Sequence, residues 1–259
     1  MTTPTTAALK SVRPGPVFLG LCAAFAVGVY LLLRSGAERS ALGMFGALLF
    51  VLSGWVISLS LHEFAHAFTA FRYGDRSTEV RGYLTLDPRK YTHAGLSIAL
   101  PLLIVALGGI GFPGGAVYLN TAAFTPAQRT KVSLAGPATN LVLGLALLAA
   151  LASTTPTTAN LNLWAATAAL AFLQLSATLL NILPVPGFDG YGALEPHLPA
   201  NIRQAAEKIA PFGFLILFLL LFIPQLNSAF FGLVYHAFEA FGISPAFVSY
   251  GIRLFAFWL

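Results

Sequence analysis

Two histidines and a glutamate stand close together in a pattern that could hold a catalytic metal ion. His62, Glu63 and His66 occur in the stretch LHEFAHAF, residues 61–68. On a helix, side chains at positions i and i+4 lie on one face, so both imidazoles could bind one Zn²⁺. The intervening glutamate would lie beside the ion and could accept a proton from its bound water. These residues therefore predict a zinc site with Glu63 as the general base.

The three residues follow a long apolar segment. Ala41 to Leu61 contains no charged side chain, and at about 1.5 Å per residue it could cross the roughly 30 Å of a bilayer core. A pair of hydrogen-bonded interface histidines is the alternative to a metal site. Ionisable groups beside lipid are costly, however, and this cost favours a functional site.

The composition is that of an integral membrane protein. Of the 259 residues, 57% are hydrophobic and 9% are charged, whereas soluble domains carry about 25% charged residues. The charge-free runs are Val17–Leu33, Ala41–Leu61, Ala94–Leu119, Val132–Leu151, Leu161–Leu183 and Ile209–Leu226. They predict an all-α polytopic membrane protein with about five to six transmembrane helices.

The third run, residues 94–119, differs from the others because it is rich in helix breakers. These are Pro101, Gly108, Gly109, Gly111, Pro113, Gly114 and Gly115. A straight membrane helix would not carry so many, and broken backbone at membrane depth occurs only inside protein or beside a wet cavity. We therefore predict a re-entrant, β-hairpin-like element. Its end, AVYL (116–119), and the preceding VRGYLTL (80–86) favour strands that could pair with an extended substrate.

A catalytic zinc needs a third protein ligand, and three acidic residues are candidates. Asp189 ends the stretch NILPVPGFD, where prolines stop a helix and Gly190 permits a tight turn at the membrane edge. Asp87 fits a turn residue better. Glu195 remains an alternative, because Glu completes many sites of this type.

Counting the membrane crossings tests whether Asp189 can lie at the same membrane face as the histidines. If residues 94–119 do not cross, Val132–Leu151 and Leu161–Leu183 bring the chain back to the face of His62 and His66. The same topology, with a cytoplasmic N-terminus, puts most Lys and Arg in cytoplasmic loops and only Arg34 and Arg39 outside. It predicts a multi-pass plasma-membrane protein. The basic residues form no contiguous face, so nucleic acid is excluded as a partner despite the net charge of +5.

Three motifs together resemble the site-2 protease family of intramembrane zinc metalloproteases. They are HExxH, AGPATN (135–140) and the Asn-x-x-Pro-x-Pro-x-x-Asp-Gly pattern that ends at Gly190. The likeness covers roughly residues 50–195. It implies a three-helix catalytic core in which His62, His66 and Asp189 bind zinc and Glu63 is the general base.

Asn140 and Asn181 are polar residues within apolar helices. Each could hold the substrate backbone or stabilise an oxyanion, or could instead make an interhelical hydrogen bond. Gly136 and Pro137 fit a close approach of helices near the site better than a chemical role.

These features divide the chain into an N-terminal tail and first helix (1–40), a catalytic core (41–195) and C-terminal transmembrane and peripheral helices (196–259). We expect an intramembrane zinc endopeptidase that cuts in or near single-pass transmembrane segments of other proteins within the lipid bilayer. One alternative is a membrane zinc protease for loop or prenylated substrates, with Glu195 as third ligand. The other is a zinc-binding scaffold or transporter without enzyme activity.

Overall fold

A computed structural model describes residues 12–91, 116–256 and 258 of the chain. Within this part the regular structure is helical, with no strand. Five helices are long and apolar enough to cross a membrane: Pro16–Ser35 (α2), Ala41–Arg72 (α3), Pro126–Ala152 (α6), Leu161–Ile182 (α7) and Ala200–Leu221, which combines α9 and α10. The described residues thus confirm a helical, multi-pass protein, while most of the predicted re-entrant element lies outside them.

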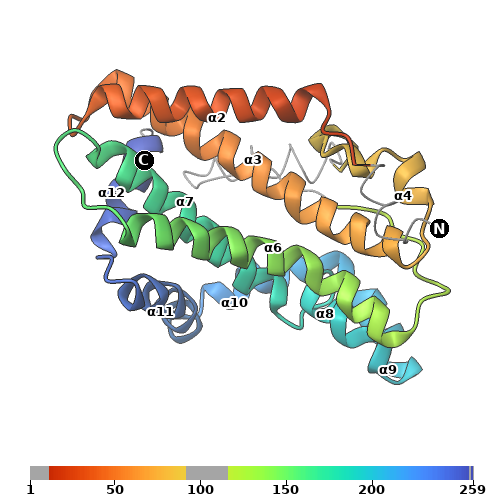
Figure 1. Ribbon diagram of the computed structural model, residues 1–259. Coiled ribbons are helices and arrows are strands. Elements are labelled where there is room, and N and C mark those ends of the chain that lie inside the picture. The colour runs from red at the N-terminus through yellow and green to blue at the C-terminus, as the bar shows by residue number, and fades with distance from the viewer. Residues whose placement is uncertain (1–11, 92–115, 257, 259) are drawn as a thin grey trace.

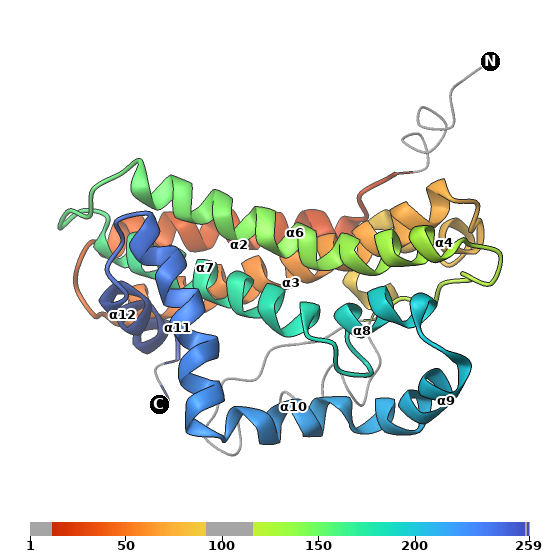
Figure 2. The ribbon, with the colours of Figure 1, turned by 90° about the horizontal axis from the view of Figure 1, so that it is seen from below.

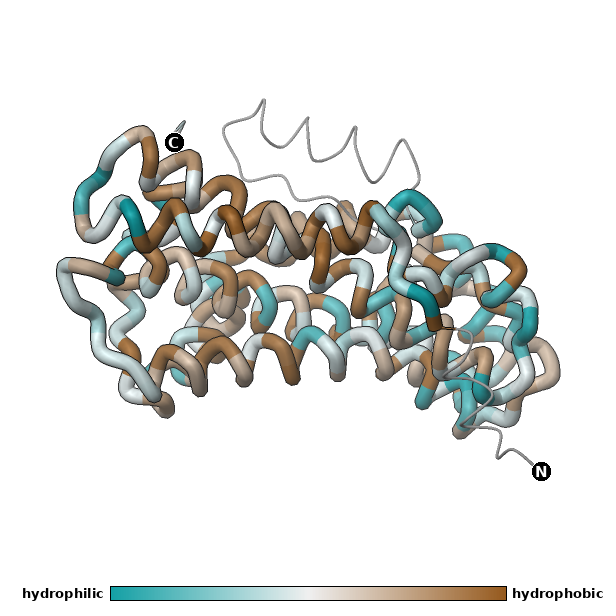
Figure 3. Tube along the Cα trace, turned by 45° about the horizontal axis from the view of Figure 1, so that its top comes forward, coloured by the Kyte–Doolittle hydropathy of each residue, from teal (hydrophilic) through white to brown (hydrophobic). Residues whose placement is uncertain are grey.

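Helix α3 is the centre of the bundle and contacts α2, α6 and α7 (Figure 1). The chain leaves α3 and enters α6 at the same end, since His66 contacts Val132 there. Hydrophobic residues follow the long helices, and hydrophilic residues gather at the end that carries α4 (Ser77–Val80) and α8 (Asp189–Leu194), as Figure 3 shows. The end of the bundle where α3 finishes is therefore polar.

Local sequence signals define where α6 begins. Thr125 accepts a hydrogen bond from the Gln128 amide, and the Gln128 side chain accepts one from the Thr125 amide. This reciprocal capping box is followed by Pro126, whose fixed φ suits the first turn of a helix. The well-defined start sets the register of α6, which carries the AGPATN motif.

Small residues allow α2 and α3 to pack closely. A Cβ on Gly28 would lie 2.7 Å from the Phe50 amide nitrogen, which no real side chain tolerates. Close backbone approach through small residues is how helices associate in lipid, where no hydrophobic force draws them together. Gly28 is therefore a packing residue of the first helix pair.

The C-terminal segment turns back towards the core. Helices α9 (Ala200–Ile209) and α10 (Gly213–Leu221) run along one side of the bundle, and α11 (Pro224–Ala240) leads back to α12 (Ala246–Phe255), as seen in Figure 2. Helix α12 contacts α7 and α3, and its Val248 and Leu254 are fully buried. Helix α12 thus packs one face against the core of the bundle and leaves Ser249 and Arg253 exposed.

The prediction of a strand at residues 80–86 is wrong. The segment forms the end of α4 and a 3₁₀ turn, η1 (Tyr83–Thr85). Gly82 (φ 75°) and Leu86 (φ 58°) adopt left-handed conformations that interrupt an extended backbone. Tyr83 and Leu84 are both buried although they are consecutive, so the alternation that suggested a strand does not separate two faces. No strand is assigned at the described residues 116–119 either.

Candidate metal centre

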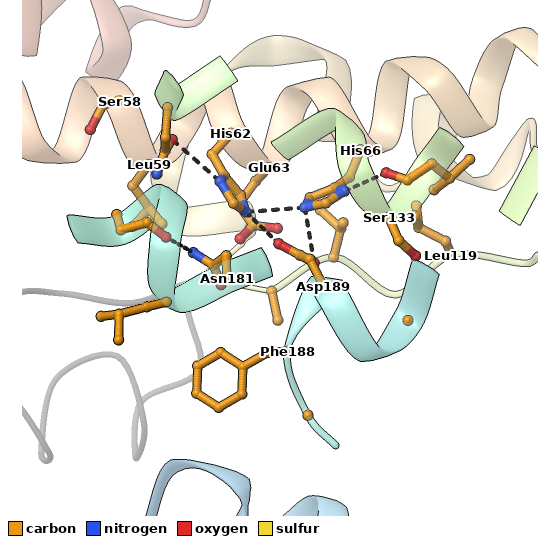
Figure 4. Close-up of a pocket in the computed structure, with 18 of the residues that line it drawn as sticks. Ser58, Leu59, His62, Glu63, His66, Leu119, Ser133, Asn181, Phe188 and Asp189 are labelled. Atoms are coloured by element: carbon orange, nitrogen blue, oxygen red, sulfur yellow. Dashed lines mark hydrogen bonds and ion pairs between the residues drawn. The ribbon is translucent and has the colours of Figure 1, made fainter. Parts of the chain in front are cut away.

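The two histidines of the HExxH motif lie on one face of α3, as their spacing predicted (Figure 4). Both are buried, and their Nε2 atoms are 3.0 Å apart. Helix α3 continues for about three turns beyond the end of the apolar run at Leu61 and reaches Arg72. The motif therefore lies within a continuous helix, near its C-terminal end and near the polar end of the bundle.

Asp189 joins the histidines from the other side. It is the first residue of α8 and follows a turn in which Gly187 has a φ of 101°. One carboxylate oxygen lies 3.2 Å from Nε2 of His62, and the other lies 3.3 Å from Nε2 of His66. One ligand atom from each of the three residues can be chosen so that all lie within 4.8 Å of one another. The turn after α7 thus completes a group of three donors.

Gly190 is what allows α8 to start where it does. A Cβ on this residue would overlap the carbonyl oxygen of Ile182 at the end of α7. Only glycine permits this approach of the two backbones. The Asp-Gly pair therefore acts as a unit, in which the glycine makes room for the turn that brings the aspartate to the histidines.

The other two acidic candidates are engaged elsewhere. Glu195 accepts a hydrogen bond from Arg129 at 2.9 Å, and Asp87 forms an ion pair with Arg89 at 2.6 Å. The ion pair with Arg89 lowers the pKa of Asp87. Neither residue belongs to the group of donors around His62.

Hydrogen bonds to the far sides of the rings orient the histidines. His66 Nδ1 lies 2.7 Å from the carbonyl oxygen of Val132, which can only accept, so this nitrogen carries the proton. His62 Nδ1 lies 3.3 Å from Oδ1 of Asn140 and donates in the same way. In neutral rings, both Nε2 atoms then present lone pairs to the centre of the group.

This arrangement fits a divalent metal ion. Two imidazole lone pairs and a carboxylate facing one another repel unless a cation lies between them. Asp189 supplies the carboxylate, with one oxygen towards each imidazole. Its Oδ2 is buried and accepts no hydrogen bond from the described residues. Two His nitrogens and one carboxylate oxygen, with ring N–H groups held by second partners, are a typical zinc donor set.

Gly136 of α6 lies directly against the donors. A Cβ at this position would overlap the Nε2 atoms of both His62 and His66. Close approach at Gly136 was predicted, but the group that it approaches is the metal donor set itself. The glycine thus leaves open the space into which the two imidazoles point.

Gly136→Ala is therefore expected to lower bound zinc to well below one ion per chain, because the added methyl group occupies the space between the donors. Metal analysis of the purified protein measures this. Gly232→Ala is the matched control, since a Cβ there meets nothing within 4 Å. Full zinc occupancy in the Gly136 variant would contradict the assignment.

Glu63 lies beside the donor group and is also buried. Its carboxylate lies near His62, His66 and Asp189, and the backbone amide of Val117 lies near it as well. A buried carboxylate that does not itself ligate, yet lies next to the ligand atoms, is placed to exchange protons with a water molecule there.

A cavity of about 640 Å³ opens onto this group. Its walls come from α3, α6 and α7, from residues 116–121 and from Phe188 and Phe214. A volume of this size is that of a substrate-binding site. Asn181 lies in the wall and donates one hydrogen bond to the Ala177 carbonyl, whereas Asn140 makes the interhelical bond to His62 described above.

Two functional groups had no signal in the sequence. The Val132 carbonyl orients His66 and the Val117 amide contacts Glu63, and both belong to the backbone. Every residue carries these groups, so only the packing of α6 and of residues 116–121 against α3 identifies them.

Comparison with known proteins agrees with the geometry. Residues 50–157 match the sequence profile of Peptidase family M50. The chain is 50% identical to the "Putative zinc metalloprotease Rip2" of Mycobacterium tuberculosis and 51% identical to that of Mycolicibacterium smegmatis, in each case over 96% of both chains. It is 31% identical to the "Putative zinc metalloprotease YwhC" of Bacillus subtilis, over 67% of this chain and 80% of the relative. No solved structure matches. With a matching profile and relatives aligned over nearly its full length, the chain belongs to peptidase family M50.

Proposed function

We propose that the protein is an intramembrane zinc endopeptidase of the plasma membrane, with its N-terminus in the cytoplasm. It would hydrolyse peptide bonds in or near transmembrane segments of other membrane proteins. One observation carries the proposal: His62, His66 and Asp189 converge beside the buried Glu63, at the end of helices apolar enough to span a bilayer.

The residues have distinct parts in the reaction. His62, His66 and Asp189 would hold Zn²⁺, which supplies a Lewis acid that activates water and polarises the scissile carbonyl. Glu63 accepts the proton of the attacking water and gives it to the leaving amine. Asn140 and the Val132 carbonyl keep the histidine rings in the ligating orientation. Asn181, in the cavity wall, is placed to bind the substrate backbone or the developing oxyanion.

The shape of the site supports an extended substrate. An amide inside a helix is shielded by its own hydrogen bonds, so a transmembrane segment must unwind before hydrolysis. Val117 and Leu119 line the cavity within a segment that is itself neither helix nor strand. Backbone groups of this segment would pair with the substrate as an edge strand does.

Leu119→Pro tests the pairing because it removes one backbone N–H beside the cavity. We expect about a tenfold loss of cleavage, the effect of one lost hydrogen bond, with bound zinc unchanged. Leu119→Ala is the matched control, since it shortens the side chain but keeps the N–H. If both variants cleave at the rate of the unmodified protein, the pairing is wrong.

The proposal is tested by reconstituting the protein in vesicles with single-pass reporters and mapping the products by mass spectrometry. The expected result is a cut in or near the membrane segment, absent with Glu63→Gln. Cleavage restricted to loop or prenylated reporters would favour the first alternative, although its third ligand, Glu195, is paired with Arg129. Bound zinc with no cleavage of any reporter would favour the scaffold or transporter.

A further inference from the structure

Residues 116–120, here called the wall segment, are anchored through alternate backbone amides. Ala116 donates to the Tyr91 carbonyl at 2.8 Å, Tyr118 to the Tyr83 hydroxyl at 3.4 Å, and Asn120 to the Asp75 carboxylate at 2.8 Å. A spacing of two is that of a β-strand edge. Here the partners are two side chains and one carbonyl of the connection after α3, in place of a second strand.

The alternation determines what the other side of the wall segment presents. If the amides of residues 116, 118 and 120 point towards the connection, those of Val117 and Leu119 point the opposite way. Both of these residues line the cavity, and the Val117 amide faces Glu63. The register of the anchors therefore decides which amide meets the proposed general base.

Asp75 is the charged anchor. It is 5% exposed, and its two oxygens have separate tasks. Oδ1 accepts hydrogen bonds from the Ser77 amide (3.0 Å) and hydroxyl (2.6 Å) at the start of α4, and Oδ2 accepts the Asn120 amide. A carboxylate accepts such bonds more strongly than a neutral oxygen does. One side chain thus links the end of α3 to a residue 45 positions later.

We propose that Asp75 is a positioning residue for the hydrolysis and acts through Asn120. By holding the Asn120 amide it fixes the register of the wall segment, so that the Val117 amide meets Glu63. The inference rests on the proposed function. A displacement of about 1 Å near a reacting centre can cost on the order of 100-fold in rate, so an anchor outside the cavity can matter for the reaction.

The test uses the full chain in detergent, with three readouts: bound zinc, hydrogen exchange of the amides at 116–120, and kinetics on a transmembrane reporter. Asp75→Ala removes the anchor. Asn120→Pro removes the amide proton that Asp75 holds and also fixes the φ of residue 120. Asn120→Ala, which loses the same side chain but keeps the N–H, is its matched control. Ser77→Ala breaks the hydroxyl bond of Asp75 towards α4 but leaves the bond to Asn120.

Asp75→Ala and Asn120→Pro are each expected to lower kcat by about 10- to 100-fold, with unchanged zinc and faster exchange at 116–120. The double variant should lose no more than either alone, since both changes break the same hydrogen bond, from the Asn120 amide to Asp75. Ser77→Ala and Asn120→Ala should stay within about twofold of the unmodified protein.

Three results would overturn the inference: additive losses in the double variant, an equal loss in Ser77→Ala, or unchanged exchange at 116–120. If Asp75→Ala does not fold, the comparison of kcat and hydrogen exchange between Asn120→Pro and Asn120→Ala tests the inference. Failure of the proposed function is seen separately. In that case the unmodified protein cleaves no reporter. Hydrogen exchange still tests the anchoring of residues 116–120, which would be wrong if the Asp75 and Asn120 variants left the exchange unchanged.

Discussion

Glu63→Gln is expected to reduce peptide hydrolysis by about 10²- to 10⁴-fold, the usual contribution of a general acid–base group. Glutamine has the shape of glutamate but cannot take a proton from water. It would still fill the buried position beside the histidines. Bound zinc should remain, since His62, His66 and Asp189 are unchanged. Reporter turnover and metal content, measured on the same preparation, check the expected loss of hydrolysis and the expected retention of zinc.

Glu79→Gln is the matched control for this change. Glu79 lies on α4, is exposed, and does not line the cavity. Reporter turnover by the Glu79→Gln variant should therefore equal that of the unmodified protein. If Glu63→Gln kept most of the activity, another group would have to be the base. If it lost zinc, Glu63 would be a ligand and the proposed division of roles would be wrong.

Asp189→Ala is expected to lower bound zinc from about one ion per chain to a small fraction after dialysis, because a catalytic zinc needs three protein ligands. The change also removes the only carboxylate of the donor group, which offsets the charge of the ion. The histidines alone would then have to hold the ion. Turnover should fall with the zinc content, and metal analysis after dialysis measures the loss.

Glu195→Ala separates the two candidates for third ligand. Glu195 is about one-quarter exposed and pairs with Arg129 at the cavity wall, so its loss should leave zinc in place. An ion pair of this kind contributes about 1 kcal/mol or less to stability, so the variant should fold. Loss of zinc in Glu195→Ala, with zinc kept in Asp189→Ala, would reverse the assignment.

The sequence by itself determined the features that depend on local periodicity. Hydropathy identified the long apolar helices, because each must cover the bilayer thickness with its own residues. A spacing of four put His62 and His66 on one face, because the geometry of a helix is the same wherever it lies. Counting crossings put Asp189 on the membrane face of the histidines, and the Asp-Gly turn after α7 does reach them.

Only the tertiary structure decided the features that depend on how separate segments meet. The alternation of residues 80–86 suggested a strand, but Gly82 and Leu86 adopt left-handed conformations that exclude it. The burial of one face of α12 comes from its contacts with α7 and α3. The Val132 carbonyl, the Val117 amide and the open space at Gly136 acquire roles from distances to α3. Backbone groups look alike in every sequence. Their chemistry is set by the crossing of α3 with α6 and by the anchoring of residues 116–120, which no local pattern encodes.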